Sequence, residues 1–79
     1  ARADLYSLGV LMFEMLTGAK PYHARTAQEL LRLHIEAPVP TLPAPHQHLQ
    51  PVLDRLMAKN PDDRFASATE LLDALEQLC

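Results

Sequence analysis

The sequence contains very few of the residues that build phosphate-binding and disulfide-rich proteins. Its 79 residues include two glycines and one cysteine. A glycine-rich phosphate loop is therefore excluded, because Gly9 and Gly18 are far apart and each suits a helix position. Cys79 excludes an internal disulfide framework and fits a reducing compartment, so we expect a cytoplasmic location.

Basic clusters and membrane-length apolar runs are also missing. The net charge is −3 with histidine neutral, and the lysines and arginines are scattered. This balance argues against a nucleic acid or an anionic membrane as partner, and against a helix-turn-helix DNA binder, which needs a basic face. No apolar run approaches the about 20 residues that span a bilayer, so we expect no membrane segment here.

The chain is long enough for one small domain at most. A domain of this size hides only about 60% of the surface that its unfolded chain exposes. The sequence begins with Ala1 rather than methionine and shows no signal peptide. We therefore expect it to be a piece of a larger protein.

The most apolar stretch, residues 5–16, predicts the central element. Its apolar residues lie on all sides of a helical wheel, as in a helix buried all round, and only three residues interrupt them: Ser7, Gly9 and Glu14. A strand is the competing interpretation, but the length and the stop at Gly18 and Pro21 favour a helix over about 4–17. Asp4 is placed to cap its first turn.

Three further helices are predicted, over about residues 27–36, 49–59 and 68–78. Thr26 with Glu29, and Ser67 with Glu70, have the spacing of capping boxes. The helix over 27–36 has one apolar stripe and should lie on the surface; the stripe consists of Ala27, Leu30, Leu31 and Ile35. Asn60 can take a left-handed cap at the end of the third helix. The predicted fold class is all-α, with four helices and no strand.

Residues 37–46 carry four prolines at nearly alternate positions. This pattern opposes a helix and favours an extended, polyproline-like path. We favour a loop that crosses the surface with Val39 and Leu42 as anchors. A flexible linker would contain more glycine and serine, and a ligand for a proline-reading module is the alternative functional interpretation.

Candidates for catalysis or metal binding are weak. His46 and His48 could touch a metal and Asp62 with Asp63 could form a cation site, but solvated or structural roles are favoured. Two charged residues stand beside apolar sequence, namely Asp4 and Arg64. Each suits either a local cap or ion pair, or a buried pair with a partner elsewhere.

Two segments resemble the eukaryotic-type serine/threonine protein kinases. Residues 4–10 (Asp-Leu-Tyr-Ser-Leu-Gly-Val) and 13–18 (Phe-Glu-Met-Leu-Thr-Gly), followed by Pro21 and Tyr22, are similar to the central helix of the large lobe. Residues 56–65 (Leu-Met-Ala-Lys-Asn-Pro-Asp-Asp-Arg-Phe) are similar to a late turn of the same lobe. The proline-rich segment resembles the bacterial branch. The resemblance covers essentially residues 1–79.

The resemblance implies that these are the last four helices of a kinase catalytic domain. In that family the aspartate matched by Asp4 holds the backbone of the catalytic loop, and the arginine matched by Arg64 pairs with the glutamate of the A-P-E motif. Leu8, Val10 and Leu11 match positions that anchor the hydrophobic spines. All of these partners would lie in the rest of the kinase domain.

The resemblance also implies a docking helix and no catalysis by this chain alone. The helix over 27–36 matches one that docks protein substrates and regulators, so the expected docking residues are Thr26, Glu29, Arg32 and Leu33. The motifs that hold ATP, magnesium and the nucleophile are absent from the sequence, so we expect an inactive segment whose whole protein uses ATP and Mg²⁺. The alternative is a helical interaction module or pseudokinase remnant that acts by binding only. Isolated, the chain should self-associate or stay partly molten.

Overall fold

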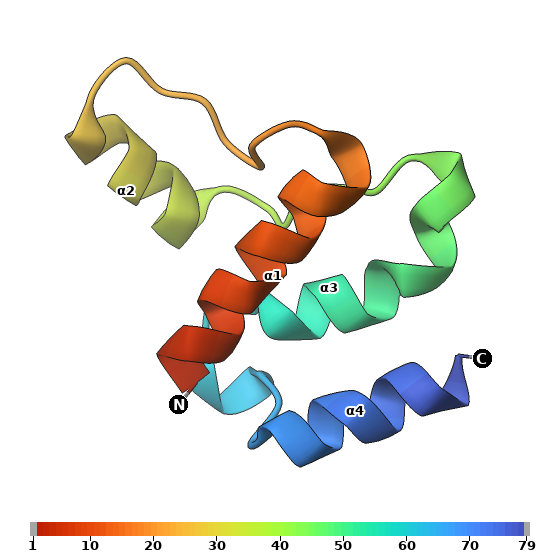
Figure 1. The fold of residues 1–79 in the computed structure, drawn as a ribbon. Coiled ribbons are helices and arrows are strands. Elements are labelled where there is room, and N and C mark those ends of the chain that lie inside the picture. Colours follow the sequence, from red (N-terminus) through yellow and green to blue (C-terminus); the bar gives the residue numbers. More distant parts are fainter. Residues whose placement is uncertain (1, 79) are drawn as a thin grey trace.

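The computed structural model describes residues 2–78, and these fold into helices joined by loops (Figure 1). The α-helices are α1 (Arg2–Thr17), α2 (Ala27–Glu36), α3 (Gln50–Leu56) and α4 (Ala68–Gln77). Two short 3-10 helices, η1 (Ala44–Leu49) and η2 (Pro61–Asp63), precede α3 and α4. Residues 2–78 contain no strand, which confirms the all-α prediction.

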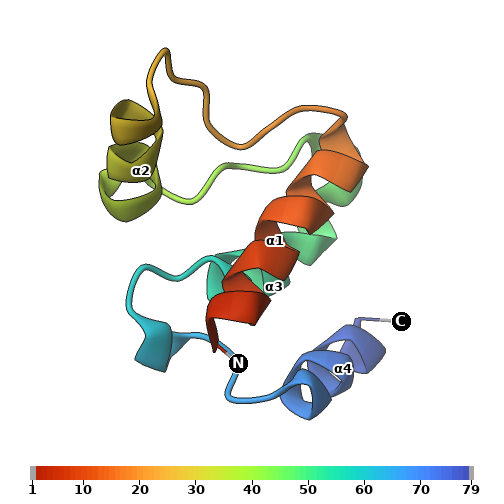
Figure 2. The same ribbon diagram turned by 60° about the vertical axis from the view of Figure 1, so that its left-hand side comes forward.

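Helix α1 crosses α3, and α4 packs against α3, whereas α2 stands apart on its two loops (Figures 1 and 2). The buried side chains form two core clusters. The first joins α1, α3 and α4 and consists of Leu5, Val52, Leu56, Phe65 and Leu71. The second joins α1, α3 and the proline-rich segment and consists of Phe13, Leu42, Leu53 and Met57.

Helix α1 ends where the sequence predicts and begins two residues earlier. Gly18 has φ 73° and its N–H donates to the Glu14 carbonyl at 2.8 Å, so it is the left-handed residue that ends the helix. Asp4 lies inside the first turn rather than at the cap position. The prediction of a helix buried all round is met on one face only, because Leu5, Gly9 and Phe13 are buried while Leu11 and Met15 are exposed.

The prediction of one α-helix over about 49–59 is met at its start, Gln50, but the helix ends three residues early, at Leu56. A 3-10 helix occupies residues 44–49, and the α-helix covers only Gln50–Leu56. Asn60 is extended (φ −82°, ψ 121°) rather than left-handed, because the following Pro61 disfavours helical backbone at that position. The Asn60 side chain instead accepts a hydrogen bond from the Asp62 N–H at 2.9 Å and caps η2.

The proline-rich segment is anchored as predicted, although its extended path is shorter. Leu42 is 1% exposed and Val39 packs against the same core cluster. Gln50 fastens the segment, because its Oε1 accepts from the Leu42 N–H at 2.7 Å and its Nε2 donates to the Pro40 carbonyl at 3.1 Å. The extended path ends at Pro43, and η1 begins at Ala44. Pro45 lies in the first turn of η1, where a proline fits because the N–H groups of that turn have no partner in the helix.

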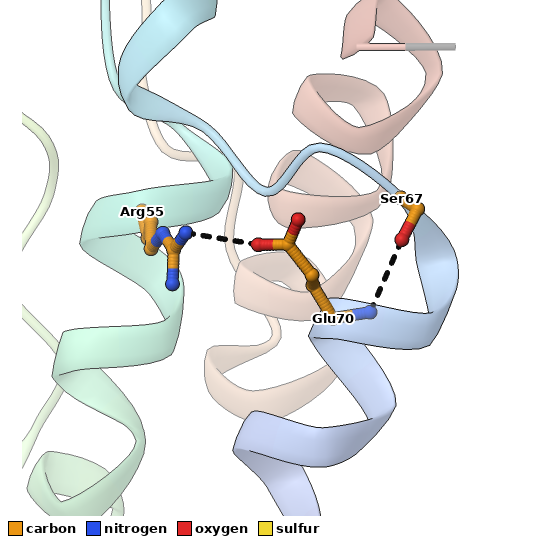
Figure 3. A network of polar contacts seen from close by, with 3 residues as sticks. All are labelled: Arg55, Ser67 and Glu70. Carbon is orange, nitrogen blue, oxygen red and sulfur yellow. Dashed lines mark hydrogen bonds and ion pairs between the residues drawn. The ribbon is translucent and has the colours of Figure 1, made fainter.

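Both predicted N-caps form, but neither glutamate closes its box. Thr26 Oγ1 accepts from the Glu29 N–H at 3.1 Å, and Ser67 Oγ from the Glu70 N–H at 3.3 Å. The Glu29 carboxylate accepts from the Arg25 N–H rather than from the cap residue. Glu70 reaches across to Arg55 on α3, with 3.2 Å between its Oε1 and the guanidinium (Figure 3).

Candidate functional site

The two expected anchors, Asp4 and Arg64, lie at the same end of the structure. Leu5 and Phe65, their neighbours in sequence, share the first core cluster. Asp4 is exposed. Arg64 is half-buried; its Nε donates to the Ala58 carbonyl at 2.8 Å, and its guanidinium carbon lies 4.8 Å from the centre of the Tyr6 ring. Arg64 thus fixes the turn after α3 to α1, in addition to any partner outside residues 2–78.

The three expected spine positions fall on two faces of α1. Val10 is half-buried and packs against the second core cluster. Leu8 and Leu11 are 41% and 50% exposed, and Met15 is 76% exposed. The structure therefore places Leu8 and Leu11 together on the uncovered face and separates Val10 from them.

An apolar groove runs along this uncovered face, between α1 and the pair α3 and α4. Its volume is about 240 Å³, and every side chain that lines it is apolar: Leu8, Leu11, Met12, Met15, Leu16, Leu56, Leu71 and Leu75. An apolar surface in water favours a covering partner, since each Å² removed from water contributes about 25 cal/mol. The groove has no polar lining group with which to orient a polar substrate.

Helix α2 carries the expected docking residues on an open surface. Thr26, Glu29 and Arg32 are exposed and Leu33 is half-buried. None of the ten residues of α2 is buried. The apolar stripe predicted for this helix faces solvent, with Leu31 63% and Ile35 61% exposed.

A cluster that the sequence reading missed joins α2 to the other helices. We call Tyr6, Tyr22, His34 and Lys59 the tyrosine–histidine cluster. The Tyr6 hydroxyl lies 2.8 Å from His34 Nδ1, and the Tyr22 and His34 ring centres are 4.9 Å apart with the rings nearly perpendicular. Lys59 Nζ donates to the His34 carbonyl at 2.9 Å and to the Tyr22 hydroxyl at 3.1 Å. Tyr22 in turn donates to the Pro38 carbonyl at 2.8 Å.

Burial and neighbouring charges shift the pKa values of the four side chains in this cluster. Desolvation, and secondly the charge of Lys59, lower the pKa of His34. Desolvation and then the charge of Arg64 lower the pKa of Lys59. Desolvation raises the pKa of both tyrosines; for Tyr6 the neighbouring Tyr22 adds to the rise and Arg64 opposes it. The neutral forms of His34, Tyr6 and Tyr22 are therefore favoured.

The weak metal and catalytic candidates are not assembled into a site. Residues 2–78 contain no group of three or more histidine, cysteine or acidic residues that could hold a metal ion. The Ser7 hydroxyl donates to the Ala3 carbonyl at 3.3 Å, as expected for a serine within a helix. Cys79 lies outside the described residues.

The fold and the groove define a helical scaffold with one uncovered apolar face. The family model for protein tyrosine and serine/threonine kinases matches residues 1–75, and the chain belongs to this family. It is 42% identical over 74 residues to the serine/threonine-protein kinase PknH of Mycobacterium tuberculosis, with 89% of this chain covered. It is also 42% identical over 78 residues to PknD of the same species, with 89% covered, and 35% identical over 77 residues to PksC of Streptomyces coelicolor, with 92% covered.

The chain spans only a small part of each of these relatives. It covers 12% of PknH, 11% of PknD and 14% of PksC. The resemblance read from residues 4–18 and 56–65 is thereby confirmed at the level of the family. Among residues 2–78 no helix is both long enough and apolar enough to cross a membrane.

Proposed function

We propose that this chain is the scaffold and docking part of a cytoplasmic serine/threonine protein kinase that transfers the γ-phosphate of ATP to protein hydroxyl groups. The observation that carries the proposal is the apolar groove along α1, which the chain leaves uncovered and which the remainder of a kinase domain would cover. Leu8 and Leu11 would contact that remainder directly. Asp4, exposed at the same end as Arg64, would hold the backbone of the catalytic loop.

The chain alone would be inactive and would act by positioning. Its sequence offers no glycine-rich loop, and its described residues offer no metal-ligand cluster, so ATP and Mg²⁺ would be bound by the rest of the protein. Helix α2 would present Thr26, Glu29, Arg32 and Leu33 to protein substrates or regulators. Its open surface, with no buried residue, supports this role.

Phosphate transfer to a general protein substrate tests the proposal. The intact protein that carries this chain should transfer phosphate from ATP, and the isolated chain should not. Asp4→Asn in the intact protein should lower kcat by at least about tenfold, because a misplaced catalytic loop loses its orientation. Asp73→Asn, which alters an exposed carboxylate on α4, is the matched control and should leave kcat unchanged.

The same assay distinguishes the kinase proposal from its main alternative, a protein that acts by binding only. An intact protein that binds partners through α2 but transfers no phosphate would replace the kinase proposal with a pseudokinase or interaction module. Arg32→Glu, which reverses an exposed charge on α2, should weaken binding of a protein substrate and raise its KM without changing turnover of a short peptide. Equal losses on both substrates would remove the docking role from α2.

A further inference from the structure

Helix α2 is attached to the other helices mainly through one residue, His34. None of the ten residues of α2 is buried, so hydrophobic burial contributes little to its position. The contacts that reach it from elsewhere converge on His34: Tyr6 from α1, Tyr22 from the loop before α2, and Lys59 from the turn after α3. The position of α2 therefore depends on this residue, through its ring toward Tyr6 and Tyr22 and through its carbonyl toward Lys59.

The geometry around His34 suits a neutral ring. The Tyr6 hydroxyl lies 2.8 Å from Nδ1 and donates to it when that nitrogen carries no proton; in the other tautomer the hydroxyl accepts from Nδ1–H and donates to the His34 carbonyl at 3.4 Å. A protonated ring would place its charge beside the Lys59 ammonium, which is hydrogen-bonded to the carbonyl of the same residue. The Arg64 guanidinium lies over the Tyr6 ring and adds a second cation to the surroundings.

We propose that protonation of His34 releases α2 from α1 and α3, so that pH controls whether α2 is docked. The two rings that pack on His34 edge to face, Tyr6 and Tyr22, would then lose their partner. The proline-rich segment that follows α2 stays anchored by Val39, Leu42 and Gln50, and Tyr22 packs against the second core cluster, so the movement is confined to residues 23–38.

The direction of the pH effect follows from linkage. Folding lowers the pKa of His34, so the docked state binds fewer protons than the released state. Docking is therefore strongest above the ordinary imidazole pKa of about 6.5 and weakens as pH falls below it. The contribution of the neutral imidazole to docking is fully lost once the pH lies below the lowered pKa of the docked form.

Hydrogen exchange in the intact protein tests the proposal. After correction for the intrinsic rate, protection of the α2 amides should fall, by at most about tenfold, between about pH 7.5 and about pH 5.5, while the α1 amides keep theirs. His34→Asn keeps a neutral acceptor near Nδ1 and should abolish this pH dependence. His23→Asn alters an exposed histidine and should retain it. A wild-type protein without the loss, or a His34→Asn variant that shows it in full, would overturn the proposal.

If the His34→Asn variant releases α2 at every pH, hydrogen exchange cannot show the pH dependence. A proton titration of the imidazoles then tests the proposal. His34 should titrate below the ordinary imidazole pKa of about 6.5, and Lys59→Met should move its titration upward, because the neighbouring charge is removed. A His34 that titrates at or above that ordinary value would contradict the proposal. The readouts do not use catalytic activity, so the test stands whether or not the proposed function holds.

Discussion

Gly9 lies where α1 crosses α3, and the crossing leaves no room for a side chain. A Cβ built there would lie 2.8 Å from Met57 Cγ and 2.9 Å from Leu56 Cβ. The Met57 side chain can move, but Leu56 Cβ is fixed to the backbone of α3. We expect Gly9→Ala to lower the free energy of unfolding of the intact protein, since overpacking costs about 1–3 kcal/mol and better helix propensity returns at most about 1 kcal/mol.

Denaturant unfolding with Ser7→Ala as control checks the Gly9 prediction. Ser7 is exposed on the same helix, and its replacement should change the free energy of unfolding by less than about 0.5 kcal/mol. Stabilisation by Gly9→Ala would mean that the helices separate easily at this crossing. Gly9 would then not be required for the close approach of α1 and α3.

At the level of residues, sequence reasoning succeeded where the cause is local. Gly18 and Ser67 were assigned from the turn chemistry of their neighbours, and both have the expected cap geometry. His34 could not be assigned in this way, because its partners Tyr6 and Lys59 are distant in sequence. A paired tyrosine and histidine carry no periodic signal, so only the assembled fold reveals the cluster.

The proline-rich segment is held as an element by one side chain, Gln50. This amide accepts from the Leu42 N–H and donates to the Pro40 carbonyl and to Asp54 Oδ1. Gln50→Ala would leave the Leu42 N–H without this acceptor, at a cost of about 1–3 kcal/mol if it stays buried. We expect faster hydrogen exchange at Leu42 and easier proteolysis of residues 38–45. Gln28→Ala, on an exposed face of α2, should change neither, and slow exchange at Leu42 in Gln50→Ala would show that Leu42 anchors the segment unaided.

The start of α4 depends more on its cap than on its ion pair. Ser67→Ala removes the acceptor for the Glu70 N–H and should cost about 0.5–2 kcal/mol. Glu70→Gln removes the charge opposite Arg55; both side chains are near half exposed, at 44% and 50%, so the expected loss is about 0–1 kcal/mol (Figure 3). Thermal unfolding of both variants and of the double variant checks the order. A larger loss from Glu70→Gln, or one independent of salt, would contradict it.

The sequence predicted where the helices lie along the chain more accurately than the residues at which they begin and end. The 3.6-residue pattern placed α2 at Ala27–Glu36, as observed. The pattern did not show that α3 ends at Leu56, because Met57 continues the apolar period as the C-cap residue beyond the last helical turn. The short 3-10 helices at 44–49 and 61–63 contain Pro45 and Pro61 and were not predicted.

The molecule as a whole has an apolar face that its own helices do not cover. Helix α1 is apolar on all sides, but α3 and α4 bury only the face that carries Leu5 and Phe13. The sequence predicted a helix buried all round, and residues 2–78 bury it on one face only. The face that carries Leu11 and Met15 is exposed in the described residues, and the remainder of the proposed kinase domain would cover it.

This uncovered face predicts opposite effects of one double substitution in two contexts. The isolated chain should self-associate and bind a hydrophobic dye, and Leu11→Glu with Met15→Glu should reduce both, because two carboxylates interrupt the apolar groove. In the intact protein the same pair would be buried without partners and should lower the free energy of unfolding by at least about 3 kcal/mol. Leu31→Glu, on the exposed stripe of α2, is the control and should cost the intact protein less than about 0.5 kcal/mol. Sedimentation and denaturant unfolding measure the two effects; an intact protein that tolerates the double substitution would show that the groove stays open to solvent, and α1 would then not be the centre of a larger core.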